Sequence, residues 1–326
     1  MRDVHKSFRQ RQRPQDVASS LRSLFRPEFR TIQALRGVNL DIQRGEVVAY
    51  AGPNGAGKST TIRLIAGLSV PDSGSVRALG VDPARKRINY MRRIAVVFGQ
   101  RTELWWDHSV GASFEWKRAT WGIEDAAYRT MVGRLKDQFD LEPMWRTLAR
   151  ELSLGQRMRA DLALALLHDP ELILLDEPTL GLDVVVRDRM LEWIRHLNRD
   201  AGKTVFITSH SMQDLERLDA RVVIVHQGSL RFDGSFDQLR TTVTDRRRLV
   251  VRSSYEQAPN LEGARLIESI NGVHTYDFVA AETSAVSLLS QLTEQEHIHD
   301  ISTSPASIDE VIGDVYRNLV DDPGAR

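Results

Sequence analysis

The stretch VVAYAGPNGAGKST, residues 47–60, decides the fold of this chain. From Gly52 to Ser59 it fits the pattern G-x-x-x-x-G-K-[ST], in which glycines let backbone N–H groups close around phosphate oxygens. An apolar run typical of a buried strand precedes the glycines, and a helical pattern follows them. The N-terminus of that helix adds partial positive charge. We therefore predict a nucleotide site, with Lys58 on the β- and γ-phosphates and Ser59 on Mg²⁺. The alternative is a chance glycine-rich turn.

Two acids stand at the end of a second apolar run, in ELILLDEPTLGLD, residues 171–183. The apolar residues Leu172 to Leu175 are typical of a parallel strand that is buried on both faces. Ligands of open α/β sheets bind at the carboxyl ends of the strands, and adjacent acids there need a metal or a polar ligand. We predict that Asp176 holds Mg²⁺ and that Glu177 polarises the attacking water. An acidic strand-to-loop turn is the alternative.

Two further apolar runs each end in one polar residue. RIAVVFGQ ends at Gln100, and TVFITSH ends at His210. A single histidine after a strand is usually structural, but here four strand ends would converge on one phosphate site. We therefore expect His210 to contact the γ-phosphate, and Gln100 to sense Mg²⁺ and the attacking water.

A longer motif is more specific than these. The stretch RELSLGQRMRADLALALLHDPELILLDEP begins at Arg150 and places LSLGQ directly before a predicted helix that leads to the acidic strand. Together with GLD at residues 181–183 and His210, this order of motifs resembles the ATP-binding cassette (ABC) ATPases over about residues 35–240. These proteins are the motor subunits of ABC transporters. The resemblance implies an α/β P-loop NTPase cassette with a RecA-like core, an antiparallel β subdomain and a helical signature subdomain.

The resemblance also implies roles for single residues. Nucleotide and Mg²⁺ contacts are expected along the whole first loop, at Gly52, Pro53, Asn54, Gly55, Ala56, Gly57, Lys58, Ser59 and Thr60. The implied catalytic set is the base Glu177, the switch histidine His210 and the Q-loop glutamine Gln100. The implied Mg²⁺ ligands are Ser59, Gln100 and the Walker B aspartate Asp176.

A second group of residues is expected to act on another copy of the cassette. In the family, the signature residues, here Ser153 and Gly155, face ATP bound to a second cassette. Gln156, at the end of the signature, and the D-loop acid Asp183 are also expected to contact nucleotide. A Ser–Gly loop that opens a helix is a second anion site. The chain holds one P-loop and one signature, so we expect a dimer that encloses two ATP molecules and opens on hydrolysis. Leu154 departs from the family, whose common form has a second glycine there.

The implied partners are ATP, a second cassette and integral membrane permease subunits, which would hold the chain at the cytoplasmic face of the cell membrane. The adenine-stacking aromatic of the family is usually tyrosine. The best candidate here is Phe8, which can stack but lacks the hydroxyl. We expect no nucleic-acid partner, because the formal net charge is zero whereas nucleic-acid-binding domains are usually basic.

The segment VVFGQRTELWWDHS, residues 96–109, enters the predicted helical subdomain at about residues 101–160. In the family this subdomain forms a groove for a short helix of the membrane subunit. We expect at least one of Trp105 and Trp106 to meet that subunit, because two adjacent rings rarely both face a small core. Asp107 is the predicted cap of the next helix. The segment also resembles ABC ATPases of ABC-2-type exporters, which points to efflux of a small hydrophobic or cationic compound, such as a drug.

The two ends of the chain are predicted to differ. Residues 1–240 form the cassette, with an arginine-rich insertion at 9–30 that is either a basic amphipathic helix on anionic lipid or permease, or a solvated loop. Residues 241–326 form a small accessory α+β domain, with strands at 246–253, 274–280 and 296–302, a helix at 282–295 and a last helix that opens with a capping box at Ser307. Its role is to stabilise the dimer or to regulate it.

The composition of the chain limits the classes of protein to which it could belong. The chain has 326 residues, 41% of them hydrophobic, no cysteine, and neither a signal-peptide core nor a membrane-spanning run. We therefore expect a protein that reaches membranes only through a partner. Other cassette proteins remain as alternatives: a translation or DNA-repair ATPase, an importer ATPase or a non-hydrolysing regulatory cassette. The last is disfavoured because Glu177 and His210 are both present.

Overall fold

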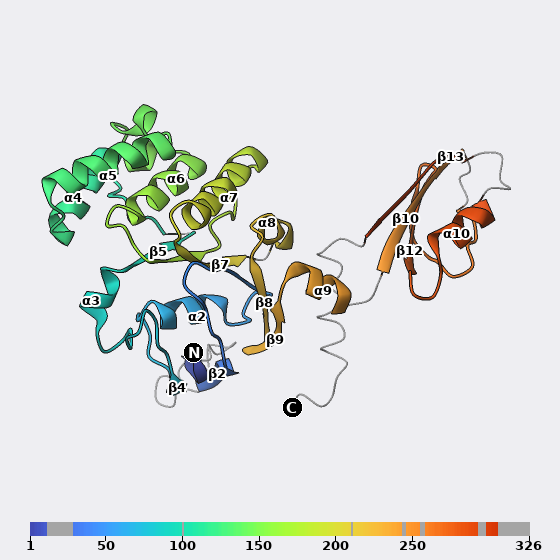
Figure 1. Ribbon diagram of the computed structural model, residues 1–326, viewed down its shortest axis with the longest axis horizontal. Coiled ribbons are helices and arrows are strands. Elements are labelled where there is room, and N and C mark those ends of the chain that lie inside the picture. Colours follow the sequence, from blue (N-terminus) through green and yellow to red (C-terminus); the bar gives the residue numbers. More distant parts are fainter. Residues whose placement is uncertain are drawn as a thin grey trace, which may run out of the picture. The chain divides into compact units, whose positions relative to one another are not determined.

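The computed structural model describes residues 1–11, 29–99, 101–209, 211–242, 246–254, 258–292 and 298–305. The chain falls into two compact units, Met1–Gly234 and Ser235–Arg326 (Figure 1). None of the described helices is both long and apolar enough to cross a lipid bilayer.

A six-stranded sheet forms the centre of the first unit, in the order β5-β6-β7-β3-β8-β9. All neighbours are parallel except β8 and β9. The strands are β3 (Val47–Ala51), β5 (Ile94–Phe98), β6 (Leu172–Asp176), β7 (Thr204–Ser209), β8 (Arg221–His226) and β9 (Ser229–Gly234). Phe98 pairs with Asp176, and Asp176 pairs with Thr208. This register brings the polar residues that follow β5, β6 and β7 to one edge of the sheet.

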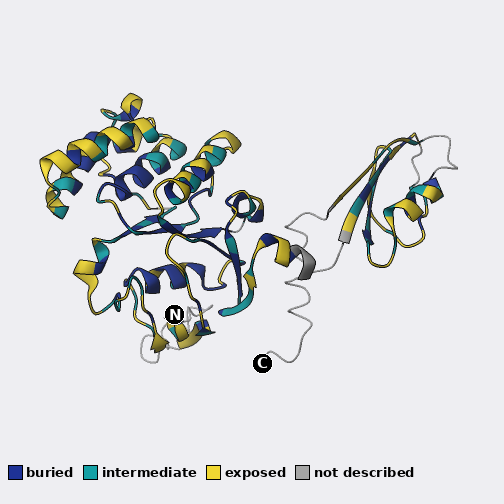
Figure 2. Cartoon of the chain, in the orientation of Figure 1, coloured by how far each residue is buried: buried dark blue, intermediate teal, exposed yellow. Residues whose placement is uncertain are grey.

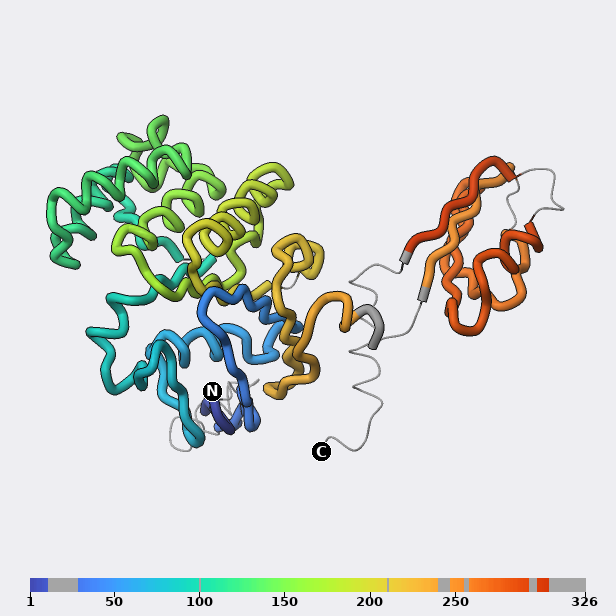
Figure 3. The backbone as a smooth tube through the Cα atoms, viewed as in Figure 1, coloured from blue at the N-terminus to red at the C-terminus, as the bar shows by residue number. Residues whose placement is uncertain are grey.

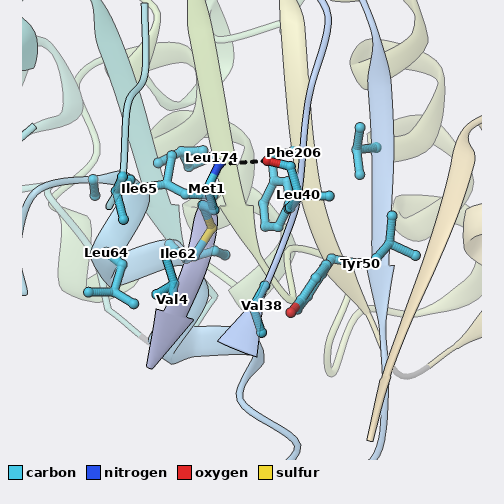
Figure 4. Packing of buried hydrophobic residues seen from close by; sticks show 14 of the residues in the cluster. Met1, Val4, Val38, Leu40, Tyr50, Ile62, Leu64, Ile65, Leu174 and Phe206 are labelled. Atoms are coloured by element: carbon cyan, nitrogen blue, oxygen red, sulfur yellow. Dashed lines mark hydrogen bonds between the residues drawn. The ribbon is translucent and has the colours of Figure 1, made fainter. Parts of the chain in front are cut away.

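Helices cover both faces of this sheet, which explains why its central strands are continuously apolar. Figure 1 shows α2 on one face and α6 and α7 on the other, and Figure 2 shows the strands between them as buried. The helices are α2 (Lys58–Ile65), α3 (Arg87–Met91), α6 (Leu154–Ala165), α7 (Val184–Arg199) and α8 (Met212–Glu216). In Figure 4, Ile62 of α2 packs with Leu174 of β6 and Phe206 of β7. The expected α/β P-loop fold is confirmed.

An antiparallel sheet in the order β2-β1-β4 packs beside α2. It consists of β1 (Arg2–Arg11), β2 (Phe29–Val38) and β4 (Ser73–Ser75). Its buried side joins the same core through Val4 and Val38. The ends of the segment predicted as an insertion, 9–11 and 29–30, are paired strand residues that lengthen this hairpin. The predicted amphipathic helix at 17–25 lies outside the described residues.

The helical part of the first unit contains α4 (Val110–Trp121), α5 (Asp125–Gln138), two short 3-10 turns, η1 (Glu142–Met144) and η2 (Ala149–Glu151), and α6. The prediction that Asp107 caps α4 is wrong, because Ser109 holds that position and its hydroxyl accepts a hydrogen bond from Ala112 N. Asp107 instead forms an ion pair with Arg150, at 2.7 Å between Oδ1 and Nη1.

The second unit is a four-stranded antiparallel sheet with one helix packed against it. Its elements are α9 (Phe236–Thr242), β10 (Arg246–Ser253), β11 (Arg265–Ile270), β12 (Val273–Val279), α10 (Ala285–Leu292) and β13 (Ile298–Pro305), and the strand order is β11-β12-β10-β13. Figure 3 traces this path through the sheet. The three predicted strands and the helix near 282–295 are confirmed. The predicted last helix and its capping box at Ser307 lie outside the described residues.

The edge strand β11 is the element that the sequence pattern did not predict. Every residue from Arg265 to Ile270 is exposed, including Leu266 and Ile270. A strand that buries neither face has no alternation of apolar and polar residues from which to recognise it.

Candidate functional site

The loop between β3 and α2 is built from close backbone contacts that only glycine allows. A Cβ on Gly52 would lie 2.4 Å from the carbonyl oxygen of Val225. Gly57 has φ +112°, and a Cβ there would lie 2.6 Å from the carbonyl oxygen of Ala34. The loop therefore brings its backbone N–H groups to the start of α2, whose N-terminus favours an anion.

Lys58 is the buried cation of this loop, with 6% of its surface exposed. Its Nζ donates hydrogen bonds to the carbonyl oxygens of Gly52, at 2.7 Å, and Pro53, at 3.3 Å. The same Nζ lies 3.4 Å from Oε1 of Glu177. The predicted phosphate-binding lysine and the predicted base are thus in direct electrostatic contact.

Asp176, at the end of β6, lies between two hydroxyl groups. Its Oδ1 accepts hydrogen bonds from Ser59 Oγ, at 3.3 Å, and from Thr208 Oγ1, at 2.7 Å. A hydroxyl and a carboxylate oxygen are the hard donors that Mg²⁺ binds beside phosphates. Among the described residues, no three His, Cys, Asp or Glu side chains form a metal cage. The donor set therefore fits a Mg²⁺ ion whose remaining ligands are nucleotide oxygens and water.

Thr208 is a site residue that the sequence did not reveal. Its Oγ1 donates to Asp176 and accepts a hydrogen bond from the backbone N of Glu177, at 3.1 Å. It thereby orients both acids. The only sequence signal is a hydroxyl residue inside the apolar run of β7, two positions before His210.

Glu177 sits at a strained point of the backbone, with φ +52°. A non-glycine residue in this region costs on the order of 1–2 kcal/mol and marks a constrained site. Gly99 lies against it: a Cβ on Gly99 would be 2.5 Å from the carbonyl oxygen of Glu177, and Gly99 N donates to Asp176 O at 2.8 Å. Gly99 therefore holds the end of β5 against the two acids.

Gln100 and His210 themselves lie outside the described residues. Their neighbours Gly99 and Ser209 are at the same edge of the sheet, since Phe98 pairs with Asp176 and Ser209 pairs with Ala51. A cavity of about 640 Å³ opens at this edge and is lined by Ser59, Arg63, Leu68, Phe98, Gly99, Arg101, Asp176, Glu177 and Leu180.

The signature residues lie at the N-terminus of α6. Ser153 Oγ accepts a hydrogen bond from Gln156 N, and Gln156 Oε1 accepts one from Ser153 N, which together form a capping box. Gly155 has no room for a side chain, because a Cβ would lie 2.8 Å from Val186 Cγ1. Asp183 in turn caps α7 by accepting from Val186 N at 3.0 Å.

These residues form an exposed surface of the first unit. The side chains of Ser153, Gln156 and Asp183 are exposed, as are Val184 and Val185 beside them. Within the described part of the chain, the hydrogen bonds of Ser153 and Asp183 are to their own helix starts and none reaches the loop 52–60. The signature and the P-loop of one chain are therefore separate surfaces.

Phe8 lies on β1, opposite Ile32 of β2, and is 40% exposed. Lys6 Nζ is 5.6 Å from the centre of its ring. The ring is thus partly accessible to a stacking partner.

The tryptophan pair is exposed on the helical part, with 41% of Trp105 and 50% of Trp106 accessible. Trp105 packs edge-on against Trp116, with ring centres 4.5 Å apart, and Trp106 lies under the guanidinium group of Arg157. The alternative that both rings are core residues is therefore wrong.

A groove lies elsewhere on the helical part, and its volume is about 620 Å³. Its lining is Arg92, Trp121, Ile123, Ala126, Ala127, Thr130, Met131, Leu167, His168 and Asp169. Trp105 and Trp106 do not belong to this lining, and their expected contact with a membrane subunit stays a prediction. Trp121 stacks on His168 with ring centres 4.3 Å apart. Burial lowers the pKa of His168 to about 4, so its ring is neutral at physiological pH.

The chain is similar in sequence and in structure to known proteins. Residues 35–180 match the family model described as ABC transporter. The chain is 32% identical over 215 residues to the ABC transporter ATP-binding protein NatA of Bacillus subtilis, across 66% of this chain and 87% of that protein. It is 34% identical over 221 residues to the probable multidrug ABC transporter ATP-binding protein YbhF of Escherichia coli, across 65% of this chain but only 36% of YbhF. A solved ATP-binding subunit of an ABC transporter superposes with a TM-score of 0.59 at 29% identity, across 64% of this chain and 87% of that one.

Proposed function

The chain belongs to the ABC transporter ATP-binding proteins, which are ATPases, and we propose that it powers export through separately encoded membrane subunits. The observation that carries this proposal is the convergence of Lys58, Ser59, Asp176 and Glu177 at one edge of the sheet. Two independent strand ends, β3 and β6, supply these groups. A purely structural cluster would not need a buried lysine on a glycine loop beside two acids.

The residues divide between holding the nucleotide and activating water. Lys58 and the backbone of residues 52–60 would bind the phosphates, and Ser59 and Asp176 would hold Mg²⁺, together with Gln100. Bound Mg²⁺ neutralises phosphate charge and orients the γ-phosphate. Phe8 would stack on the adenine through the accessible part of its ring.

Glu177 would act as the general base. Its carboxylate is held by Lys58, and its backbone N–H is held by Thr208, so its position is set from two sides. A base fixed in this way can orient a water molecule for attack in line with the leaving group. His210 would contact the γ-phosphate from the end of β7.

We infer that two copies combine to complete each site. The signature face of Ser153, Gly155 and Gln156, with Asp183 beside it, has exposed side chains, and among the described residues the hydrogen bonds of Ser153 and Asp183 do not reach the P-loop of the same chain. A helix N-terminus is a favourable site for an anion, so this face suits the γ-phosphate of ATP on a second copy. A symmetric dimer would bury two such sites.

The groove beside Trp121 is the proposed docking point for a short cytoplasmic helix of the membrane subunit. Its lining is mostly apolar and includes one basic and one acidic side chain, Arg92 and Asp169. An amphipathic helix fits such a groove. The exposed rings of Trp105 and Trp106 would widen the contact, because aromatic side chains are enriched in interfaces. The chain would thereby be held at the cytoplasmic face of the cell membrane.

The transported compound is proposed from the chain's relatives. YbhF is named a probable multidrug protein. We propose a small hydrophobic or cationic compound, and an ABC-2-type membrane partner.

Co-purification tests the proposal directly. The tagged chain is expressed in its native host, membranes are solubilised in mild detergent, and the captured proteins are identified by mass spectrometry. The expected result is one or two polytopic membrane proteins, and ATPase activity in the purified complex. Capture of ribosomes or DNA, with nothing from the membrane fraction, would leave the ATPase chemistry intact and overturn the export role.

A further inference from the structure

Asp161 is a buried acid on α6 that the nucleotide site does not use. Only 3% of its surface is exposed. Its Oδ1 accepts three hydrogen bonds, from Thr102 Oγ1 at 2.8 Å, Glu103 N at 2.9 Å and Leu104 N at 3.3 Å. Burial raises its pKa to about 6, and the three donors oppose that rise, so the group is largely a carboxylate above neutral pH. A charge buried at this cost needs all three donors to satisfy it.

The loop that Asp161 holds leads directly away from the nucleotide site. Gly99 and Arg101 line the cavity with Asp176 and Glu177, and residues 102–104 follow at once. The helix that carries Asp161 begins at the signature, where Ser153 caps it. The Asp161 side chain therefore joins residues 102–104, which follow the nucleotide site in the chain, to α6, which carries the signature residues at its N-terminus.

The same loop is joined to the groove by a second set of contacts. Glu103 Oε2 forms an ion pair with Lys117 Nζ at 2.7 Å, and Lys117 is buried. Lys117 Nζ also lies 5.5 Å from the centre of the Trp121 ring, which stacks on His168 in the groove lining. Contact is thus continuous from Trp121 through Lys117 and Glu103 to the loop on Asp161.

We propose that Asp161 is a positioning residue that fixes residues 102–104 against α6, so that the groove and the hydrolytic site move as one. The coupling to the groove rests on the proposed function, whereas the effect on hydrolysis does not. Asp161 touches neither nucleotide nor water. It acts through the loop, whose first residues lie at the two acids.

Two variants separate this role from simple packing. Asp161→Ala removes the acceptor that Thr102 Oγ1 and the Glu103 and Leu104 backbone N–H groups share. Asp161→Asn keeps an oxygen in the same place and is the conservative control. Asp140→Ala is a matched control, because Asp140 also pairs with a residue of α6, Arg159, but its own side chain is 66% exposed.

The measurements are steady-state ATP hydrolysis and hydrogen–deuterium exchange on the purified full chain. For Asp161→Ala we expect kcat to fall about 10- to 100-fold, as for a misplaced catalytic loop, with KM for ATP within about twofold of the native value. Exchange at the Glu103 and Leu104 amides should rise at least about tenfold. Asp161→Asn should recover most of both properties, and Asp140→Ala should change neither.

Unchanged kcat and unchanged exchange in Asp161→Ala would overturn the proposal, as would an Asp161→Asn variant as impaired as Asp161→Ala. If Asp161→Ala does not fold, Thr102→Val replaces it, because this change removes one of the three donors. For Thr102→Val, a rise in exchange and a loss of kcat that are smaller than those expected for Asp161→Ala would support the proposal. Native values of both properties in Thr102→Val would contradict it. Absence of hydrolysis in the native chain would instead contradict the proposed function, so the two failures are distinguishable.

Discussion

Lys58 is the cation that contacts both the glycine loop and the acid Glu177. Its ammonium group bonds to two carbonyl oxygens of its own loop and faces the carboxylate of Glu177. The four-carbon side chain of lysine is flexible, so its ammonium group can exchange these oxygens for phosphate oxygens without a change in the backbone. The ammonium group of Lys58 therefore has three oxygen atoms around it, two from carbonyl groups and one from the Glu177 carboxylate.

Removing this charge tests the phosphate site. Lys58→Ala should weaken ATP binding at least about 100-fold, because a buried charge-assisted contact to phosphate is lost. Binding is measured with a fluorescent ATP analogue. Lys86→Ala, an exposed lysine on the same unit, should bind as the native chain does. Equal affinity in both variants would contradict the assignment of the loop.

His168 provides a prediction about pH. Its pKa is lowered from 6.5 to about 4 by burial, while Nε2–H donates to the carbonyl oxygen of Ile94 at 2.8 Å. Between pH 6.5 and pH 4 the unfolded chain therefore binds a proton that the folded chain does not, so the free energy of unfolding falls as pH falls. The lowered pKa of His168 corresponds to a loss of up to about 3 kcal/mol in the free energy of unfolding as the pH falls from 7 to below 4.

His168→Gln should remove this part of the acid sensitivity. Urea unfolding of the native chain and the variant is followed by circular dichroism at pH 7 and pH 4.5. The variant should lose less stability on acidification than the native chain, by about 1–3 kcal/mol. An equal loss in both would show that His168 is accessible to protons in the folded state.

At the scale of elements, the junction of α6 and α7 is the most tightly specified part of the site. Gly155 and Val186 leave no space between the two helix starts, and Leu154 lies against Gly181, where a Cβ would be 3.1 Å from Leu154 Cδ2. The leucine that departs from the family pattern thus packs on the loop of Asp183. The signature and the D-loop form one rigid surface.

Gly155→Ala should therefore destabilise the chain by about 1–3 kcal/mol, because the added methyl group overlaps Val186. Val186→Ala in the same chain should restore most of that stability by removing the opposing methyl groups. The melting temperatures of both single variants and the double variant form a double-mutant cycle. Simple additivity of the two changes would contradict the packing seen here.

The tryptophan segment allows a prediction about the membrane partner. Trp105→Ala combined with Trp106→Ala should leave the fold and basal ATP hydrolysis intact, because both rings are about half exposed. The variant should recover less membrane subunit in co-purification. Trp145→Ala is the contrasting control, since its ring packs on the buried Phe114 and its loss should lower the melting temperature. Collapse of the tryptophan-pair variant would show that the rings are structural.

Particular residues show what the sequence could and could not predict. Residues 52–59 were recognisable because phosphate binding demands glycine and lysine at set spacings. Thr208 and Asp161 were missed because their partners, at 176 and 102–104, are distant in sequence, and no local pattern joins them. Asp107 and Ser109 are both good helix caps by residue type, and only the structure shows that Ser109 accepts from Ala112 N while Asp107 pairs with Arg150.

For the whole molecule, the central expectation is that two copies close around ATP. Glu177→Gln should keep ATP affinity but lower hydrolysis about 10²- to 10⁴-fold, because the general base is lost. With ATP, the variant should elute as a dimer in size-exclusion chromatography with light scattering, and without ATP as a monomer. Glu192→Gln, an exposed control on α7, should hydrolyse ATP normally. A fully active Glu177→Gln variant would remove this residue as the base.

The placement of tryptophan has a consequence for spectroscopy. All six tryptophans lie between Trp105 and Trp193, so every indole is in the unit Met1–Gly234 and none is in Ser235–Arg326. Intrinsic emission excited at long wavelength therefore monitors only the first unit. A fluorescence melting curve would therefore miss the unfolding of the β10–β13 sheet, whereas far-ultraviolet circular dichroism, which follows the backbone of both units, would report it. Comparison of the two melting curves of one unlabelled chain would thus show whether its two units unfold together.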